Sequence, residues 1–123
     1  MMRLEATILY VEKIDVSSQF YASLFYQPAQ VLSPTFHSFS LGPVSVELKQ
    51  REAVKPEAIL TGGGMELSFE VADQAALLSL YDRWIALDVP MAQEPEKLVF
   101  GWTFVAEDPD KHRIRVFAPS PAS

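Results

Sequence analysis

The hydrophobic and polar positions at the start of the chain alternate. Residues 4–11 (LEATILYV) are rich in β-forming side chains, and a loose two-residue period runs through them. This pattern predicts a strand that places Leu9 and Val11 on one face and Tyr10 on the other. The segment enters this strand without a basic stretch followed by a long apolar run, so we expect no signal peptide.

The period then changes to that of an amphipathic helix. Asp15 or Ser17 is the expected N-cap, because short oxygen-bearing side chains accept from the free N–H groups of a first helical turn. The helix is predicted to run to about Tyr26, and Pro28 ends it. Its apolar stripe consists of Phe20, Tyr21, Leu24 and Phe25.

Two short strands are predicted next, at residues 35–41 and 44–49. The pair Gly42-Pro43 between them favours a tight turn. The polar stretch 50–60 reads as a linker, and it leads to three consecutive glycines at 62–64, which are too flexible for a regular element.

After the glycines the same order of patterns begins again. Residues 65–71 read as a strand, and Asp73 is the expected cap of an amphipathic helix through about Leu87. Two further strands are predicted at 98–106 and 113–117, with turn-forming residues between them.

The two halves align as an internal repeat. At an offset of 60 residues the leading strands and helices correspond, and at an offset of 68 Val46–Leu48 corresponds to Ile114–Val116. We therefore predict an α+β fold of two βαβββ repeats, at about 3–55 and about 65–119, with a linker at about 56–64. Each helix is expected to cover the outer face of a curved eight-stranded mixed sheet that surrounds a pocket.

Composition narrows the class of protein. With 123 residues, of which 49% are hydrophobic, the chain is suited to one domain with one core. The absence of cysteine excludes disulfides and thiolate metal sites, and together with the absence of an apolar run of membrane-spanning length it predicts a cytoplasmic protein. A net charge of −6 disfavours nucleic acid and anionic membrane surfaces as partners.

Several short motifs carry a family resemblance. They are Leu9-Tyr10-Val11, Ser17 with Phe20-Tyr21, Glu47-Leu48, and Glu107-Asp108-Pro109-Asp110 before Ile114. In this set the chain resembles the vicinal oxygen chelate superfamily, which includes glyoxalase I, extradiol dioxygenases, fosfomycin resistance enzymes and bleomycin resistance proteins. The resemblance covers nearly the whole chain and implies a single glyoxalase-like domain over residues 1–123. It specifies the fold better than the function.

The resemblance also implies where a divalent metal would bind. Metal-dependent members place four ligands at positions that match Ala6, Glu47, Glu66 and Arg115. Alanine has no donor atom and a guanidinium cannot act as a ligand, so the ligand set is incomplete and we expect no cofactor. Glu47 and Glu66 with water molecules are still a minimal donor set for Mg²⁺ or Mn²⁺, which keeps a divalent metal as an alternative.

The hypothesis that follows is that Arg115 takes over the electrostatic role of the metal. Glu47, Glu66 and Arg115 would then anchor a ligand, with Tyr10 and Trp102 as aromatic walls. Strand parity adds two more charges to the cavity floor, from Glu70 and Arg113. The competing interpretation is that these charges form an internal salt bridge that only supports the fold. Of the two histidines, His112 is expected to be a solvated turn residue, and a pocket role for His37 is kept as a minor alternative.

Three classes of function remain open at this point. The first is metal-independent binding of a small organic molecule, similar in kind to the bleomycin resistance proteins. The second is a glyoxalase-type lyase or isomerase that uses a weakly held metal or takes Glu47 or Glu66 as general base. The third is a regulatory domain for which the fold is only a scaffold. The resemblance implies a homodimer in each case.

Overall fold

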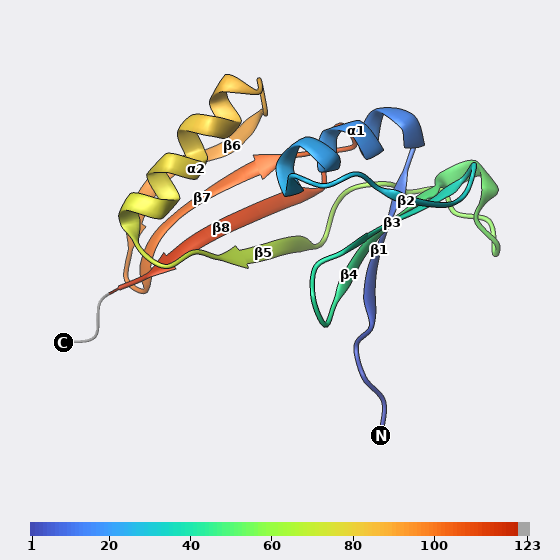
Figure 1. Ribbon diagram of the computed structural model, residues 1–123, viewed down its shortest axis with the longest axis horizontal. Coiled ribbons are helices and arrows are strands. Elements are labelled where there is room, and N and C mark those ends of the chain that lie inside the picture. The colour runs from blue at the N-terminus through green and yellow to red at the C-terminus, as the bar shows by residue number, and fades with distance from the viewer. Residues whose placement is uncertain (121–123) are drawn as a thin grey trace. The chain divides into compact units, whose positions relative to one another are not determined.

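The computed structural model describes residues 1–120, which divide into two compact units at Gly62 and Gly63. The first unit contains β1 (Ala6–Val11), α1 (Ile14–Phe25), β2 (Gln30–Ser33), β3 (Phe36–Ser40), β4 (Ser45–Gln50) and a short 3-10 helix (Arg51–Ala53). The second contains β5 (Glu66–Glu70), α2 (Gln74–Ala86), β6 (Met91–Leu98), β7 (Gly101–Glu107) and β8 (Arg113–Pro119). The predicted α+β class and the βαβββ order of both repeats are confirmed (Figure 1).

Each unit forms one four-stranded mixed sheet with the same topology. The strand order is β1-β4-β3-β2 in the first unit and β5-β8-β7-β6 in the second, and the first and last strands of each unit pair in parallel. In the first unit Leu9 pairs with Leu48, and in the second Phe69 pairs with Val116. These pairs are related by the two sequence offsets of 60 and 68, so the internal repeat extends to the strand register. The pocket shared by both repeats stays a prediction, as does the assignment of the whole chain to one domain.

In the first unit, α1 covers one face of the sheet. Leu9 and Val11 are buried beneath it, as their alternation with exposed Ile8 and Tyr10 predicted. Further side chains complete this core; they are Tyr21, Leu24, Phe39, Val46 and Leu48. Burial of such side chains is the main favourable term in folding. We call the opposite face of each sheet, which the helix leaves uncovered, the open face.

In the second unit, α2 covers β7 and β8 in the same way (Figure 1). Asp73 is the N-cap as predicted, because its Oδ1 accepts from the backbone N–H of Ala76 at 2.8 Å. The core beneath the helix is lined by Leu77, Trp84, Phe104, Ile114, Val116 and Ala118. Trp84 and Phe104 meet edge to face with ring centroids 5.4 Å apart.

The predicted start of α1 is wrong. The N-cap is Lys13, which has extended backbone and makes no side-chain capping bond. The N–H of Ile14 donates instead to the side chain of Gln50 at 3.3 Å, from the end of β4. Asp15 therefore lies in the first helical turn and Ser17 is buried within the helix. A partner 36 residues away is not visible in a local pattern.

Two strands were not located by the sequence patterns. β2 carries Val31 and Leu32 next to each other, and both are largely exposed, so no alternation marks it. β6 contains Pro95 and mostly polar residues, and its register with β7 is irregular. Both are edge strands, whose pairing depends on the neighbouring strand more than on a buried face of their own.

The segment after β4 is tied back to the end of β1. Arg51 donates to both carboxylate oxygens of Glu12, at 2.7 and 2.8 Å, and to the carbonyl of Ala58 at 3.0 Å. The hydrogen bond from Arg51 lowers the pKa of the Glu12 carboxyl below its ordinary value. These contacts hold the first part of the linker beside the first sheet.

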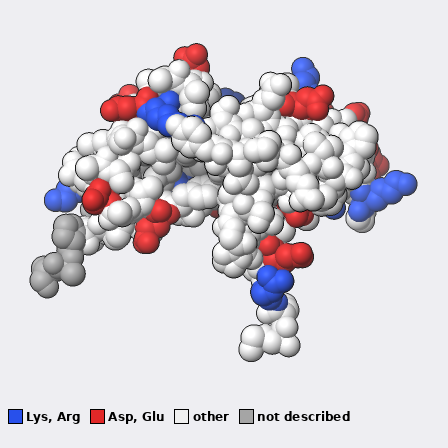
Figure 2. All heavy atoms as spheres, in the orientation of Figure 1, with Lys and Arg blue, Asp and Glu red and all other residues white. Residues whose placement is uncertain are grey.

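Charged side chains of both signs appear on the visible face, and opposite charges lie next to each other at several places (Figure 2). Within residues 1–120, no helix has the length and apolar character needed to cross a membrane.

Gly101 should be the glycine most sensitive to substitution. Its φ of 140° is unfavourable for other residues, and an added Cβ would lie 2.1 Å from the carbonyl oxygen of Ala118 on β8. We expect Gly101→Ala to lower the free energy of unfolding in urea by about 3 kcal/mol or more. Gly42→Ala is the matched control, since Gly42 also has positive φ but no atom within 4 Å of the added Cβ, and it should cost only about 1–2 kcal/mol. Equal losses in the two variants would contradict this account of Gly101.

Candidate functional site

The open face of the second sheet gathers four of the charged side chains that the sequence singled out. In the parallel register Glu66 pairs with Arg113, and Arg115 lies two residues further along β8. Because alternate residues of a strand share a face and ladder partners point the same way, Glu66, Glu70, Arg113 and Arg115 lie on one side of the sheet. The shared parity predicted for these four residues is confirmed.

Arg115 is held in place by three side chains. Its Nε donates to Glu66 Oε1 at 2.8 Å, and its Nη1 donates to Thr103 Oγ1 at 3.1 Å and to Gln93 Oε1 at 3.4 Å. Thr103 is fully buried and its hydroxyl donates to the carbonyl of Val116 at 2.9 Å, so its lone pairs are free to accept from the guanidinium. The side chains of Arg115 and Glu66 are 23% and 36% exposed. This centre is therefore ordered and accessible.

One edge of the guanidinium remains available. The contacts of Arg115 use Nε and Nη1, while Nη2 has no hydrogen-bond partner among residues 1–120. A guanidinium presents its donors in a fixed planar fork, so the remaining two N–H groups point in a defined direction. Such a fork suits a carbonyl, carboxylate or phosphate oxygen.

Glu47 and Tyr10 lie on the open face of the first sheet. Glu47 is in the middle of β4, between Ile8 on β1 and Ser38 on β3. Its Oε2 accepts from the hydroxyl of the buried Ser38 at 3.2 Å. Tyr10 borders a shallow surface hollow formed with residues 56–60. Glu47 belongs to the first unit and the Glu66–Arg115 pair to the second, so their convergence stays a prediction.

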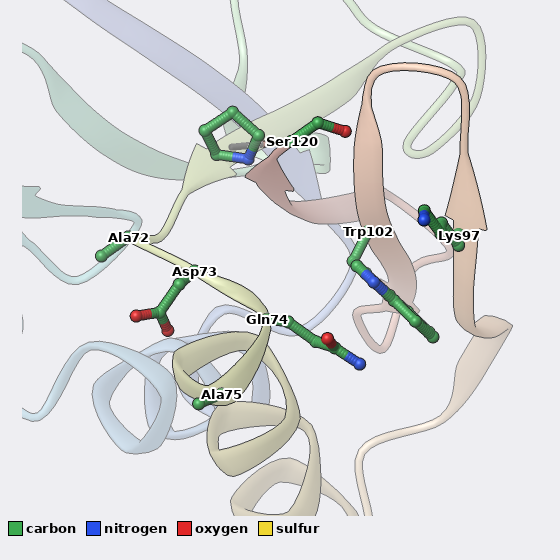
Figure 3. Close-up of a pocket in the computed structure, with 8 residues that line it drawn as sticks. Ala72, Asp73, Gln74, Ala75, Lys97, Trp102 and Ser120 are labelled. Carbon is green, nitrogen blue, oxygen red and sulfur yellow. The ribbon is translucent and has the colours of Figure 1, made fainter. Parts of the chain in front are cut away.

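Trp102 lies on the other face of the second sheet. It pairs with Ala118, which is buried on the helix side, whereas Thr103 belongs to the face of Arg115. The expectation that Trp102 and Arg115 line one cavity is therefore wrong, because the strand alternation separates them. Trp102 instead borders a hollow of about 620 Å³ at the start of α2, with Gln74 and Lys97 beside it (Figure 3). Whether Trp102 binds a ligand there stays a prediction.

Both histidines have structural partners. His112 is only 8% exposed and its Nδ1 lies 2.7 Å from Asp108 Oδ2, so the expectation of a solvated turn residue is wrong. His37 is buried on the helix side of the first sheet, where its Nδ1 lies 2.9 Å from Ser18 Oγ of α1. A side chain beneath the helix is not on the open face, which removes the pocket role considered for His37.

The side chains at the family's metal positions do not fit a metal. Ala6 provides no donor, and Glu66 is already bound to the cationic side chain of Arg115. Within the described part of the chain, no cluster of three or more histidine, aspartate or glutamate side chains has the geometry to hold an ion. The donor set at these positions therefore supports no chemical step through a bound metal.

A second hollow, of about 590 Å³, lies beside the Glu66–Arg115 pair. It is lined by Gly63, Gly64, Met65, Glu66, Lys111 and Arg113. Two cationic side chains thus border a space next to the ordered guanidinium, which gives this end of the open face a local excess of positive charge.

The sequence model of the glyoxalase/bleomycin resistance protein/dioxygenase superfamily matches residues 3–116. The chain belongs to this superfamily. The expected resemblance to glyoxalases is thereby confirmed, and the superfamily includes both enzymes and resistance proteins by its own description.

Several solved structures are similar to the chain. The protein ATC0852 from Agrobacterium tumefaciens is 42% identical, with 98% of this chain and 100% of that chain covered and a TM-score of 0.88. A lactoylglutathione lyase from Agrobacterium tumefaciens is 18% identical over 94% of this chain and 92% of its own, with a TM-score of 0.74. A glyoxalase-related enzyme from Fulvimarina pelagi is 15% identical over 96% of this chain and 88% of its own, with a TM-score of 0.84. The last two show similarity of fold alone. No curated protein matches the chain.

Sequence reasoning missed the neutral side chains of the site. Thr103 and Gln93 both accept from Arg115, and Ser38 donates to Glu47, yet none carries a motif. Thr103 was detectable in principle, because a threonine inside an apolar strand run needs a partner for its hydroxyl. Gln93 lies on β6, which the patterns did not locate.

The Glu66–Arg115 pair should contribute little to stability. Because both side chains are partly exposed, we expect Glu66→Gln to change the free energy of unfolding by less than about 1 kcal/mol. Asp108→Ala is the comparison, since the buried Asp108 carboxylate accepts from the backbone N–H groups of Asp110 and His112 and from the His112 ring, and its loss should cost at least about 2 kcal/mol. Urea denaturation measures both. A loss in Glu66→Gln as large as that in Asp108→Ala would favour a purely structural salt bridge.

Proposed function

We propose that this member of the glyoxalase superfamily binds a small organic molecule on the open face of its second sheet, with Arg115 as the polar anchor and without a divalent metal. The observation that carries the proposal is the set of hydrogen bonds made by the Arg115 guanidinium. It is held by Glu66, Thr103 and Gln93, and its Nη2 edge has no partner within residues 1–120.

Preorganisation makes Arg115 suited to ligand binding. A free arginine side chain loses rotamer entropy when it binds a ligand, whereas one that is already fixed by three partners loses little. The bond to Glu66 leaves the guanidinium charged, since arginine stays protonated in proteins. The two N–H groups of Nη2 then provide charged donors for a carbonyl or an anionic oxygen, which is the charge stabilisation that a metal supplies in other members of the superfamily.

Two further expectations accompany this proposal. The resemblance to the superfamily suggests a homodimer, and the composition suggests a cytoplasmic protein. Tyr10 on the first sheet and Trp102 beside the start of α2 remain proposed contacts for planar ligand groups, each in its own unit.

The binding proposal predicts a metal-independent ligand. In a thermal-shift screen of small organic molecules, we expect ligands that raise the melting temperature equally with and without EDTA. Calorimetric titration of such a ligand should show that Arg115→Gln weakens binding by about tenfold or more, because charge-assisted hydrogen bonds contribute about 1.5–3 kcal/mol. Arg3→Gln, in the exposed N-terminal segment, is the control and should leave the Kd within about twofold.

Two results would contradict the proposal. The first is stabilisation by Mn²⁺, Ni²⁺ or Zn²⁺ in the absence of any organic ligand. The second is an organic ligand that binds Arg115→Gln as tightly as it binds the original chain.

A second candidate function is a lyase or isomerase with Glu47 as general base. Glu47 is better suited to act as the base than Glu66. The Glu47 carboxylate accepts a hydrogen bond from Ser38 and forms no ion pair within the described residues. A carboxylate in this state can remove the proton from a hydroxyl-bearing carbon next to a carbonyl. It can then return that proton to the former carbonyl carbon of the enediolate, while the hydroxyl proton moves to the former carbonyl oxygen.

If the protein is an enzyme, loss of the general base should lower the rate of turnover and leave the affinity for the substrate nearly unchanged. If a bound organic carbonyl compound is converted, Glu47→Gln should lower kcat by about a hundredfold or more while the Kd changes little. Glu5→Gln, an exposed substitution of the same kind in the same unit that borders none of the described hollows, should leave kcat unchanged. Turnover that survives Glu47→Gln would remove Glu47 as the base.

A further inference from the structure

The second unit concentrates positive charge at one end of its open face, although the whole chain carries a net charge of −6. Lys111 and Arg113 line the same hollow as Glu66, and Arg115 is bound to Glu66. Three cationic side chains thus accompany two carboxylates at this end of the face, those of Glu66 and Glu107. In a protein of opposite overall charge, such a local excess is the electrostatic signature of a site for an anion.

Arg113 forms no ion pair among the described residues, because the nearby carboxylate of Glu66 binds Arg115. Glu66 is the ladder partner of Arg113 in the parallel register, but its carboxylate binds Arg115 instead. On the other side, Arg113 pairs in register with Glu107 of β7, and no salt bridge joins their side chains. Within residues 1–120 the Arg113 guanidinium therefore has no anionic partner.

Lys111 is placed by a turn that Asp108 organises. Asp108 Oδ1 accepts from the backbone N–H groups of Asp110 and His112, each at 2.9 Å, and Oδ2 binds the His112 ring. The backbone N–H of Lys111 donates to the Asp108 carbonyl at 3.0 Å. Asp108 is thus a positioning residue for the segment that leads into Arg113.

Lys111 also occupies a conformation that a lysine rarely adopts. Its φ of 70° lies in the left-handed region, which costs about 1 kcal/mol for a residue with a Cβ. Glycine would avoid this cost, so the turn itself does not favour a lysine at this position. Its ammonium group, like the Arg113 guanidinium, has no partner within the described residues and borders the hollow.

We propose that the ligand of this protein is a small organic anion, and that Lys111 and Arg113 bind its carboxylate or phosphate group at the end of the open face. This inference rests on the proposed function and adds the chemical class of the ligand. Gly63 and Gly64 also line the hollow and place no side chains in it, which leaves room for an anion beside the two cations.

The test uses simple anions and does not require the natural ligand. In ¹H–¹⁵N NMR spectra of the full chain at constant ionic strength, inorganic phosphate and acetate are titrated against sodium chloride. We expect saturable shifts of the amide signals of Gly63, Gly64 and residues 111–113 with at least one of the two anions. The anion that binds more tightly identifies the ligand group as phosphate or carboxylate.

Substitutions locate the site. Lys111→Gln combined with Arg113→Gln should raise the Kd of the anion by about tenfold or more, because two charge-assisted contacts are lost. Arg3→Gln is the control, since Arg3 lies in the exposed N-terminal segment and borders neither hollow of the second unit, and it should leave the Kd within about twofold. Absence of saturable shifts at the named amides, or an equal loss in Arg3→Gln, would overturn the inference.

The failure of this inference can be separated from failure of the proposed function. An organic ligand that depends on Arg115 but is neutral, and that binds the Lys111→Gln/Arg113→Gln variant as tightly as the original chain, overturns the inference alone. Saturable phosphate or acetate binding at residues 111–113, with no dependence of any organic ligand on Arg115, overturns the proposed anchor and leaves the anion site in place.

Discussion

The parallel pairing of the first and last strands in each unit is the constraint on which the rest of the structure depends. A shift of one residue in this register would turn every side chain of a strand to the opposite face. The observed register buries Ile114 and Val116 on the helix side, where Phe69 is half-buried, and leaves Glu66 and Arg115 on the open side. The same pairing that builds the core therefore also assembles the polar centre.

Arg115 of that centre differs from an isolated surface charge because three side chains fix the position of its guanidinium. Thr103 is buried and its hydroxyl donates to the carbonyl of Val116, so the guanidinium of Arg115 binds a side chain whose position is fixed. The adjoining turn is built around the buried carboxylate of Asp108 and is similarly well ordered. Rigid placement of a few polar groups on a sheet face is what a selective small-molecule site requires.

The sequence was informative where a pattern repeats or where the partner is nearby. The two offsets of 60 and 68 predicted the repeated order of elements, and the observed strand register follows the same offsets. Asp73 was recognised as a cap because the N–H group that it accepts from lies only three residues further along the chain. It was uninformative where the partner is distant, as for Ile14 with Gln50 and for Arg115 with Gln93. Trp102 was assigned to the wrong face because the sequence does not reveal which residues of β7 and β8 pair with each other.

Glu47 and Arg115 stand at equivalent places in the two repeats, since the offset of 68 relates them. The duplicated backbone has been kept while the charge at this one place has been reversed. A fold of this kind can therefore present either charge at one strand position without a change in the scaffold. Members with near-identical architecture need not share a reaction, and the side chain at this strand position is the feature by which to sort them.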